Sequence, residues 1–370
     1  MPQTDRKTRI YADHNASSPL RPEAREAMLK ALELPTNPSS IHAEGRRARA
    51  MVETARRQVA TLVDADPEAV VFTSGATEAI AMALQMRENG PFRPLMTEHA
   101  AVLAAHSFSD EEVLPIPVDP SGLPLWTPQA VETGLLAVQM ANSETGVIAP
   151  RPPRTGGFLF RDAVQAAGKI SFTLESTGAD LICISSHKLG GPQGAAALIA
   201  RTPEHLPKAL IRGGGQEKGR RGGTENVAAI AGFGAASAAA RADLLGFERR
   251  TTHLRDALEF GLASFAQAGG FELSVHGAGA PRLPNTSCFS VTGLDAATAL
   301  MAADLAGISI SSGAACSSGK VGKSHVLAAM GVADRAAKGA LRVSFGWNSA
   351  EDDAARLLEF FSSELPRLLG

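Results

Sequence analysis

Residues 184–194 read ISSHKLGGPQG, and this stretch decides the fold. The largely apolar run at 180–184 predicts a buried strand that ends in hydroxyl groups and Lys188, before glycines and a proline stop it. In open α/β sheets, ligands bind at the carboxyl ends of the strands, so Lys188 stands where chemistry is usually done. A lysine amine can form a Schiff base with a carbonyl, although a single lysine on a loop is more often simply solvated. The rest of the chain has to decide between these two interpretations.

The composition limits the classes of protein to which this chain can belong. A chain of 370 residues can hold two domains, and its 44% hydrophobic and 20% charged residues are ordinary for a soluble protein. The net charge of -2 offers no electrostatic footprint for nucleic acid or an anionic membrane. The polar start at 1–9 is not a secretory signal, and the uncharged stretch at 227–240 is shorter than the roughly 20 residues that span a bilayer. We therefore expect a cytoplasmic protein that binds neither nucleic acid nor membrane.

Three cysteines, without a CxxC pair, argue against a disulfide framework and against a zinc site. Cys183 and Cys288 lie in apolar runs and are expected to be small core residues. Cys316 is surrounded by glycine and serine, which favours an exposed and reactive thiol.

The first part of the chain alternates expected strands with helices, which indicates an α/β domain with a mainly parallel sheet flanked by helices. The expected strands are 69–72, 113–118, 135–140, 157–160, 180–184 and 195–200. The expected helices are 21–34, an amphipathic one through 48–62 whose arginines lie on a solvated face, 78–86, and 226–262 with Gly246 as a candidate break. Residues 147–155, VIAPRPPRT, leave no room for a crossover helix and predict an extended loop.

A second, smaller α+β domain is expected after this. Strands at 271–275, 288–291 and 340–345 accompany a helix at 295–305 and a last amphipathic helix from 351. The predicted boundaries are 14–246 for the large domain, and 1–13 with 247–370 for the small domain that carries Cys316.

Two stretches are candidate anion sites. The strand at 69–72 runs through TSGAT into a helix, so that backbone N–H groups and a helix dipole could face a phosphate. Simple capping by Ser74 or Thr77 is the alternative. Residues 212–226, RGGGQEKGRRGGTEN, fit either an anion-binding loop or a flexible surface loop.

Polar groups follow several of the strands. A pyridine cofactor needs a carboxylate to keep its ring nitrogen protonated, donors for its phosphate and a lysine for its aldehyde. This set of groups favours a cofactor site over a solvated lysine. Its candidate members are Thr77, His99, Asn142, Asp162, Gln165 and Lys188.

Ten motifs in order resemble one family, the cysteine desulfurases of the NifS/IscS type, which are class V aminotransferase-type enzymes of pyridoxal phosphate fold type I. The resemblance covers about residues 11–346 and is highly specific. The motifs are YADHNASSP at 11–19, NPSSIHAEGRRAR at 37–49, FTSGATEA at 72–79, TEHAAVL at 97–103, ANSETG at 141–146, DAVQAAGK at 162–169, SSHKLGGPQG at 185–194, GRRGGTEN at 219–226, SSGAACSSG at 311–319 and LRVSFG at 341–346.

The resemblance implies a role for each matching residue. Lys188 is implied to bind the aldehyde of pyridoxal 5′-phosphate and to move a proton, with Asp162 on the pyridine nitrogen and Gln165 on the ring oxygen. His99 is implied to stack on the ring and assist proton transfer. The phosphate is assigned to Ala76, Thr77, Ser185 and His187, and to Thr224 of the other subunit of a homodimer. Arg342, helped by Asn142, is assigned to the substrate carboxylate, and Cys316 is assigned as the nucleophile.

The implied reaction removes sulfur from L-cysteine, releases alanine and leaves a persulfide on Cys316 for a sulfur acceptor. That acceptor would be an iron–sulfur cluster scaffold or a thiolation protein. A selenocysteine lyase, another class V enzyme and a non-catalytic protein of the same fold are the alternatives. His99 as a capping histidine and Arg342 as a structural ion-pair arginine also stay open.

The chain departs from the family pattern at two places. Relatives have a longer segment with a helix where this chain has residues 147–155. Relatives also commonly carry a small or polar residue before the aspartate, where this chain has Arg161.

Overall fold

The computed structural model describes residues 9–35, 37–86, 90–127, 133–153, 156–313 and 323–369. Its helices are α1 (Pro22–Leu32), α2 (Ala43–Val63), α3 (Ala76–Ala83), α4 (Ala100–Ala104), α5 (Leu174–Thr177), α6 (Val227–Gly269), α7 (Ala296–Leu305), α8 (His325–Ala329), α9 (Asp334–Lys338) and α10 (Asp353–Leu369). Its strands are β1 (Ile10–Tyr11), β2 (Val70–Thr73), β3 (Phe92–Pro94), β4 (Leu135–Ala137), β5 (Phe158–Asp162), β6 (Leu181–Ser185), β7 (Ala196–Ala200), β8 (Leu273–Val275), β9 (Thr286–Val291), β10 (Ile308–Ser309), β11 (Ser311–Ser312) and β12 (Ala340–Ser344). Short 3-10 helices are η1 (Pro67–Ala69), η3 (Ser186–Lys188), η4 (Pro203–His205) and η5 (Gln216–Gly219).

The largest sheet has six strands in the order β2-β7-β6-β5-β4-β3. Strands β3 to β6 pair in parallel, whereas β7 is antiparallel to both of its neighbours, β2 and β6. Every strand except β7 therefore points the same way, which confirms the prediction of a mainly parallel sheet. The parallel strands bring their carboxyl ends to one edge, where ligands collect in folds of this kind.

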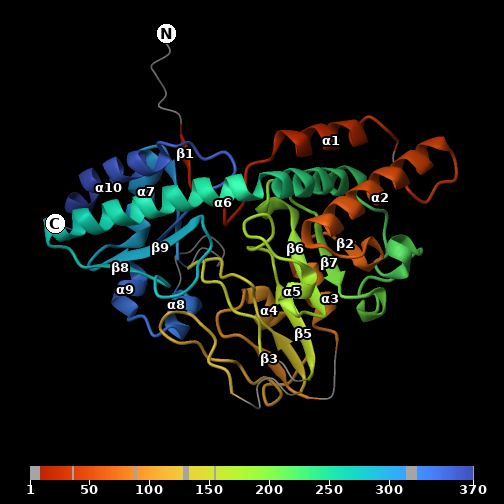
Figure 1. Cartoon of the computed structure of the whole chain (residues 1–370), viewed down its shortest axis with the longest axis horizontal. Helices are drawn as coiled ribbons and strands as arrows, with labels where there is room; N and C mark the ends of the chain where they lie inside the picture. The colour runs from red at the N-terminus through yellow and green to blue at the C-terminus, as the bar shows by residue number, and fades with distance from the viewer. Residues whose placement is uncertain are drawn as a thin grey trace, which may run out of the picture.

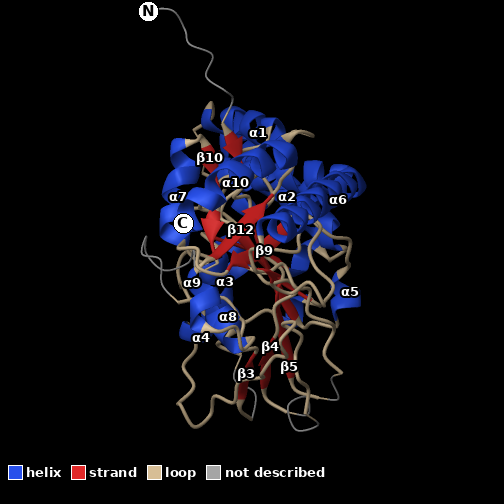
Figure 2. Cartoon of the chain, turned by 90° about the vertical axis from the view of Figure 1, so that its left-hand side faces the viewer, coloured by secondary structure: helices blue, strands red, loops and turns tan. Residues whose placement is uncertain are grey.

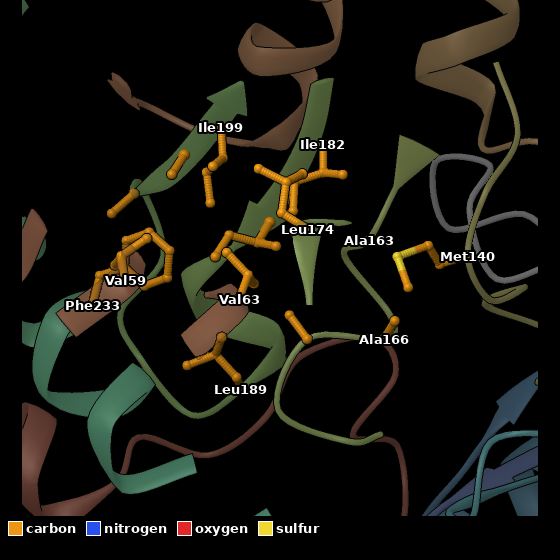
Figure 3. Packing of buried hydrophobic residues seen from close by; sticks show 14 of the residues in the cluster. Val59, Val63, Met140, Ala163, Ala166, Leu174, Ile182, Leu189, Ile199 and Phe233 are labelled. Atoms are coloured by element: carbon orange, nitrogen blue, oxygen red, sulfur yellow. The ribbon is translucent and has the colours of Figure 1, made fainter. Parts of the chain in front are cut away.

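Strand β6 is buried on both faces, as a continuous apolar run predicts. Ile182 and Ile184 point to the side where α2 and α6 pack, in one hydrophobic cluster with Phe233 (Figure 3). Leu181 and Cys183 point to the other side, in the cluster that holds α3 and α4. The two-residue period of a strand thus places a helical layer on each face of the sheet.

The expected strand at 113–118 is replaced by an extended segment that runs beside β3. Its contacts with β3 are isolated bridges, at Phe92 with Val113 and at Leu95 with Ile116. Pro115 and Pro117 explain the difference, because proline has no N–H to donate to a regular ladder. The connection between β4 and β5 contains no helix in its described residues. The predicted extended loop at 147–155 is therefore confirmed for the part of it that the structure describes.

A second sheet of four antiparallel strands has the order β11-β12-β9-β8, and β1 pairs separately with β10. Figure 2 shows β9 and β12 near the middle of the molecule and strands β3 to β5 at its lower end. The hydrophobic cluster of this second part joins Ile10 and Ala12 to the far half of α6, β9, β12, α7 and α10. The boundary near residue 246 stays a prediction, because α6 passes through it.

Helix α6 is continuous for 43 residues and connects the two parts of the molecule (Figure 1). The predicted break at Gly246 is wrong, because the Asp243 and Arg250 side chains form an ion pair across this glycine, with Nη2 to Oδ2 at 2.8 Å. By length and composition α6 could cross a membrane, but half of its most apolar window is buried inside the structure. An apolar helix that is half buried in this way is typical of the core of a fold.

Candidate active site

A cavity of about 500 Å³ lies at the carboxyl edge of the parallel strands, next to β12 of the second sheet. It is lined by nine of the residues that the sequence singled out. They are Ala76, Thr77, His99, Asp162, Gln165, Ser185, His187, Lys188 and Arg342. Residues from distant parts of the chain therefore meet in one place, as the sequence predicts.

Lys188 ends η3, directly after β6. Gly190 follows with φ +92°, and a Cβ there would come within 2.6 Å of Arg21 Cγ, so the turn that stops the segment requires glycine. The half-buried Lys188 amine donates to the backbone carbonyls of Asn15 and Ala16, each at 2.7 Å. The amine is thus held at the cavity wall by acceptors from the N-terminal segment.

Asp162 ends β5 and is almost fully buried. Its carboxylate accepts from the Val164 N–H at 2.8 Å, and the Cys183 thiol lies 3.7 Å from the same oxygen. Burial raises the pKa of Asp162 above its usual value. A buried carboxylate that faces a cavity is well placed to pair with a buried cationic N–H of a ligand.

His99 is both a helix cap and a cavity residue. Its Nδ1 accepts from the Ala101 N–H at 3.1 Å at the start of α4, so the capping interpretation is correct. Because Nδ1 is an acceptor, the proton of the neutral ring is on Nε2. Burial lowers the pKa of His99, which favours this neutral form.

No side chain caps the start of α3. The alternative interpretation of TSGAT, capping by Ser74 or Thr77, is therefore wrong. Gly75 is the N-cap and makes no side-chain bond, while the Ser74 hydroxyl donates to Glu78 Oε2 at 2.5 Å. The first N–H groups of a helix have no partner within it, and Ala76 and Thr77, the first two residues of α3, line the cavity. Ser185 and His187 line the same cavity.

Arg342 on β12 is buried and forms an ion pair with Asp13, with Nη2 to Oδ1 at 2.6 Å. Its Nη1 donates to the Ser143 carbonyl at 3.1 Å, and its Nε has no hydrogen-bond partner among the described residues. The structural ion pair predicted as an alternative is therefore present. Arg342 also lines the cavity, and its expected role toward a substrate carboxylate stays a prediction.

Asn142 is not among the residues that line the cavity, so its expected place at the site stays a prediction. Its Oδ1 accepts from the Glu144 and Thr145 N–H groups, each at 2.9 Å, and its Nδ2 donates to the Thr97 carbonyl. These bonds turn the amide inward and close the turn that ends at Gly146, where Asn142 N–H and C=O also bond the backbone. Neighbouring Ala141 and Ser143 line the cavity instead.

Two other expected site residues are not among the described residues that line the cavity. Thr224 is exposed and does not line the cavity of its own chain. Cys316 lies outside the described residues. Burial of Cys183 and Cys288 confirms that these two are core residues.

The glycine-rich loop before α6 is anchored to the sheet. The Glu217 carboxylate is buried and accepts from Arg56 Nη1 and Nη2 at 2.8 and 2.7 Å, and from the Phe72 N–H at 2.8 Å. The expectation that the arginines of α2 all lie on a solvated face is therefore wrong for Arg56. Arg221 of the same loop pairs with Glu78, with Nε to Oε1 at 2.9 Å, so the loop is also fixed to α3.

One contact joins the two places where the chain departs from the family pattern, Arg161 and residues 147–155. Arg161 precedes Asp162 on β5, and its side chain points away from the cavity, as alternation along a strand requires. Its guanidinium is buried and Nη2 donates to the Ala149 carbonyl at 2.7 Å and to the Gln139 carbonyl at 3.3 Å. Burial lowers the pKa of Arg161 to about 10. Arg161 thereby holds the start of the shortened loop against the sheet.

Three buried polar residues at the site received no role from the sequence. Lys169 lies inside the quoted motif DAVQAAGK, but no spacing rule marks a lysine four residues from Gln165 in a turn. Asn15 makes bonds from its backbone carbonyl, which a sequence cannot show. Glu98 is fully buried next to His99, and burial with the nearby Asp162 carboxyl raises its pKa well above its usual range.

The groups in the cavity fit pyridoxal phosphate. Lys188 supplies an amine for the aldehyde, and Asp162 a buried carboxylate for the ring nitrogen. The uncapped start of α3, with Ser185 and His187, supplies donors for the phosphate. Arg342 adds a guanidinium to the lining of the same cavity, which suits a substrate carboxylate.

The comparisons agree with this chemistry. The aminotransferase class-V family model matches residues 10–357. A cysteine desulfurase from Cereibacter sphaeroides is 39% identical over 95% of this chain and 94% of its own length, and cysteine desulfurase IscS from Dictyoglomus turgidum is 34% identical over 98% and 96%. A solved NifS-like protein from Rickettsia africae has a TM-score of 0.86 and 30% identity, and the match covers 97% of this chain and 99% of that one.

Proposed function

The chain belongs to the aminotransferase class-V family and is a cysteine desulfurase, and we propose that its chemistry takes place in the cavity around Lys188. The observation that carries the proposal is the meeting of Lys188, Asp162, the start of α3 and Arg342 in one cavity. These four features supply an amine, a buried carboxylate, donors for a phosphate and a guanidinium that can bind a substrate carboxylate. Pyridoxal phosphate, when bound, draws electrons away from the α-carbon of an amino acid.

The residues of the chain bind and orient the substrate, L-cysteine. Arg342 lines the cavity and has a fork geometry that matches a carboxylate, while Asp13 and the Ser143 carbonyl fix the plane of the guanidinium. Lys188 rests on two carbonyl oxygens and is the group that takes the proton from the substrate α-carbon. His99, neutral and protonated on Nε2, can donate that proton to a group in the cavity and take it back afterwards.

Cys316 is the sulfur acceptor in this proposal. Its thiolate forms a bond to the substrate sulfur while the bond between that sulfur and Cβ breaks. The electron pair of the broken bond stays with the carbon skeleton, which takes up a proton and leaves as alanine. The persulfide then passes to an acceptor protein, for which an iron–sulfur cluster scaffold or a thiolation protein is proposed.

A homodimer is part of the proposal. Thr224 is exposed and lies outside its own cavity, while its loop is fixed by the buried Glu217 and by Arg221. A rigid loop with an exposed hydroxyl can present that hydroxyl to the phosphate of a second subunit. A cytoplasmic location is proposed with it, since the acceptors named above work there.

The test is to add L-cysteine to the purified protein and to measure alanine and sulfide together, with a thiol as final acceptor. Equal amounts of both products are expected. Turnover of L-selenocysteine without turnover of L-cysteine would instead identify a selenocysteine lyase. A colourless protein that binds no pyridoxal phosphate and turns over neither substrate would leave only the non-catalytic alternative.

A further inference from the structure

Lys169 is a buried lysine that the reaction described above does not use. It is 3% exposed and lies in the turn after β5, beside the cavity wall. Its Nζ donates to Gln165 Oε1 at 2.6 Å and to Asn15 Oδ1 at 2.7 Å. Burial, together with Lys188 and Arg342, lowers the pKa of Lys169 well below its usual value. A neutral amine has two N–H donors and an ammonium has three, so either form can make both bonds.

These bonds decide which way the Gln165 amide points. A glutamine amide can turn over, because its oxygen and nitrogen have nearly the same shape. Here the oxygen is bound to an amine donor on Lys169, and Nε2 donates to the Asn15 carbonyl at 3.0 Å. A backbone carbonyl can only accept, so both partners require the same orientation. The Gln165 NH₂ group therefore lies on the side of Asn15 and the cavity.

Asn15 is fixed in the same manner. Its Oδ1 accepts from Lys169, and its Nδ2 donates to the Ser143 carbonyl at 3.1 Å and to Thr286 Oγ1 at 2.9 Å. Its backbone carbonyl then accepts from both Gln165 and Lys188. The resting position of the reactive amine thus depends on a residue that Lys169 holds.

We propose that Lys169 is a positioning residue that holds Gln165 as a hydrogen-bond donor toward the cofactor ring oxygen and Asn15 as the acceptor for the Lys188 amine. The inference rests on the proposed function, because the ring oxygen belongs to pyridoxal phosphate. When Lys188 leaves the Asn15 carbonyl to react with the aldehyde, Lys169 still donates its hydrogen bond to Gln165 Oε1. The NH₂ group of Gln165 then remains available to the ligand.

The test is a double-mutant cycle on the apoprotein with Lys169→Met, Gln165→Leu and the double variant, with pyridoxal phosphate as the probe. The dissociation constant is measured by fluorescence titration. Lys169→Met should weaken binding about 10-fold in the wild-type background, since it leaves the buried Gln165 Oε1 without its donor, whereas Asn15 Oδ1 still accepts from Asn285 Nδ2 at 3.2 Å. In the Gln165→Leu background the loss should shrink to less than about 2-fold, because the partner is gone. Equal losses in both backgrounds would overturn the inference.

The absorption spectrum of the bound cofactor is a second readout. Its maximum in Lys169→Met should move to that of Gln165→Leu, and an unmoved maximum at lower occupancy would contradict a positioning role. Lys169→Gln keeps an NH₂ donor group and should recover most of the affinity; it replaces Lys169→Met in the cycle if that variant does not fold. Lys208→Met, on an exposed lysine outside the cavity, is the matched control and should bind like wild type.

The outcomes separate the two proposals. A chain that binds pyridoxal phosphate and follows this cycle, yet makes no alanine from L-cysteine, would overturn the proposed function alone. A chain that desulfurates cysteine but shows additive losses in the cycle would overturn the role of Lys169 alone.

Discussion

Glu144→Gln should remove a pH dependence of stability that the wild-type fold carries. Glu144 is 3% exposed, accepts a hydrogen bond from the Ser324 hydroxyl and lies near Arg342. Burial raises its pKa to about 7, although Ser324 and Arg342 oppose the rise. Between the pKa of an unfolded glutamate, about 4.3, and this value, the folded chain holds a proton that the unfolded chain has lost. Stability therefore falls as the pH rises through this window.

The magnitude follows from the shift. A rise of this size in the pKa of one carboxyl corresponds to about 3 kcal/mol between pH 4.5 and pH 8. For a chain of 370 residues this amounts to about 4 °C in Tm. Glutamine mimics the protonated acid and can accept the same bond from Ser324. The variant should match wild type near pH 4.5 and exceed it by about 4 °C at pH 8.

The assay is differential scanning fluorimetry of both proteins across this pH range. Taking the difference between them cancels every group that the two proteins share. Glu248→Gln, on an exposed carboxyl of α6, is the control and should follow wild type at each pH. Parallel curves for wild type and Glu144→Gln would refute the claim that Glu144 is buried with a raised pKa.

Three further outcomes follow from the described contacts. Arg56→Met leaves the Glu217 carboxylate buried and unpaired, and should cost about 3–5 kcal/mol of stability by denaturant titration, whereas a loss below about 1 kcal/mol would speak against the buried pair. Arg342→Lys keeps the charge but loses the fork, so KM for L-cysteine should rise about 10-fold in steady-state kinetics, and an unchanged KM would remove Arg342 from the substrate carboxylate. Cys316→Ala should keep the bound cofactor but lose nearly all alanine and sulfide production from L-cysteine, and normal production would disprove the nucleophile.

Much of the fold was readable because its signals are local. The apolar run of β6, the hydroxyl-rich turn before α3 and the amphipathic pattern of α2 each follow from a few neighbouring residues. The lining of the cavity could be predicted for the same reason, since it is made of strand ends. Pro115 and Pro117 carry a local signal too, and with it the segment at 113–118 would have been recognised as an irregular edge.

The errors come from contacts between residues far apart in the chain or from side-chain orientation. Gly246 lies in an unbroken helix, because the side chains on either side of it pair. Arg56 is buried because its partner, Glu217, is brought to it by the fold. The role of Lys169 likewise depends on Asn15, which no spacing in the sequence connects to it.

The central claim is that Lys188 holds pyridoxal phosphate in the cavity between the two sheets. Its most direct test is reduction of the purified protein with borohydride, followed by peptide mass spectrometry. We expect one pyridoxyl group per chain, on the peptide that contains Lys188. Lys169 lies beside the same cavity, so the labelling of Lys188 can be compared with that of a second nearby lysine. A pyridoxyl group on Lys169 or on any other lysine, with Lys188 unmodified, would contradict the account.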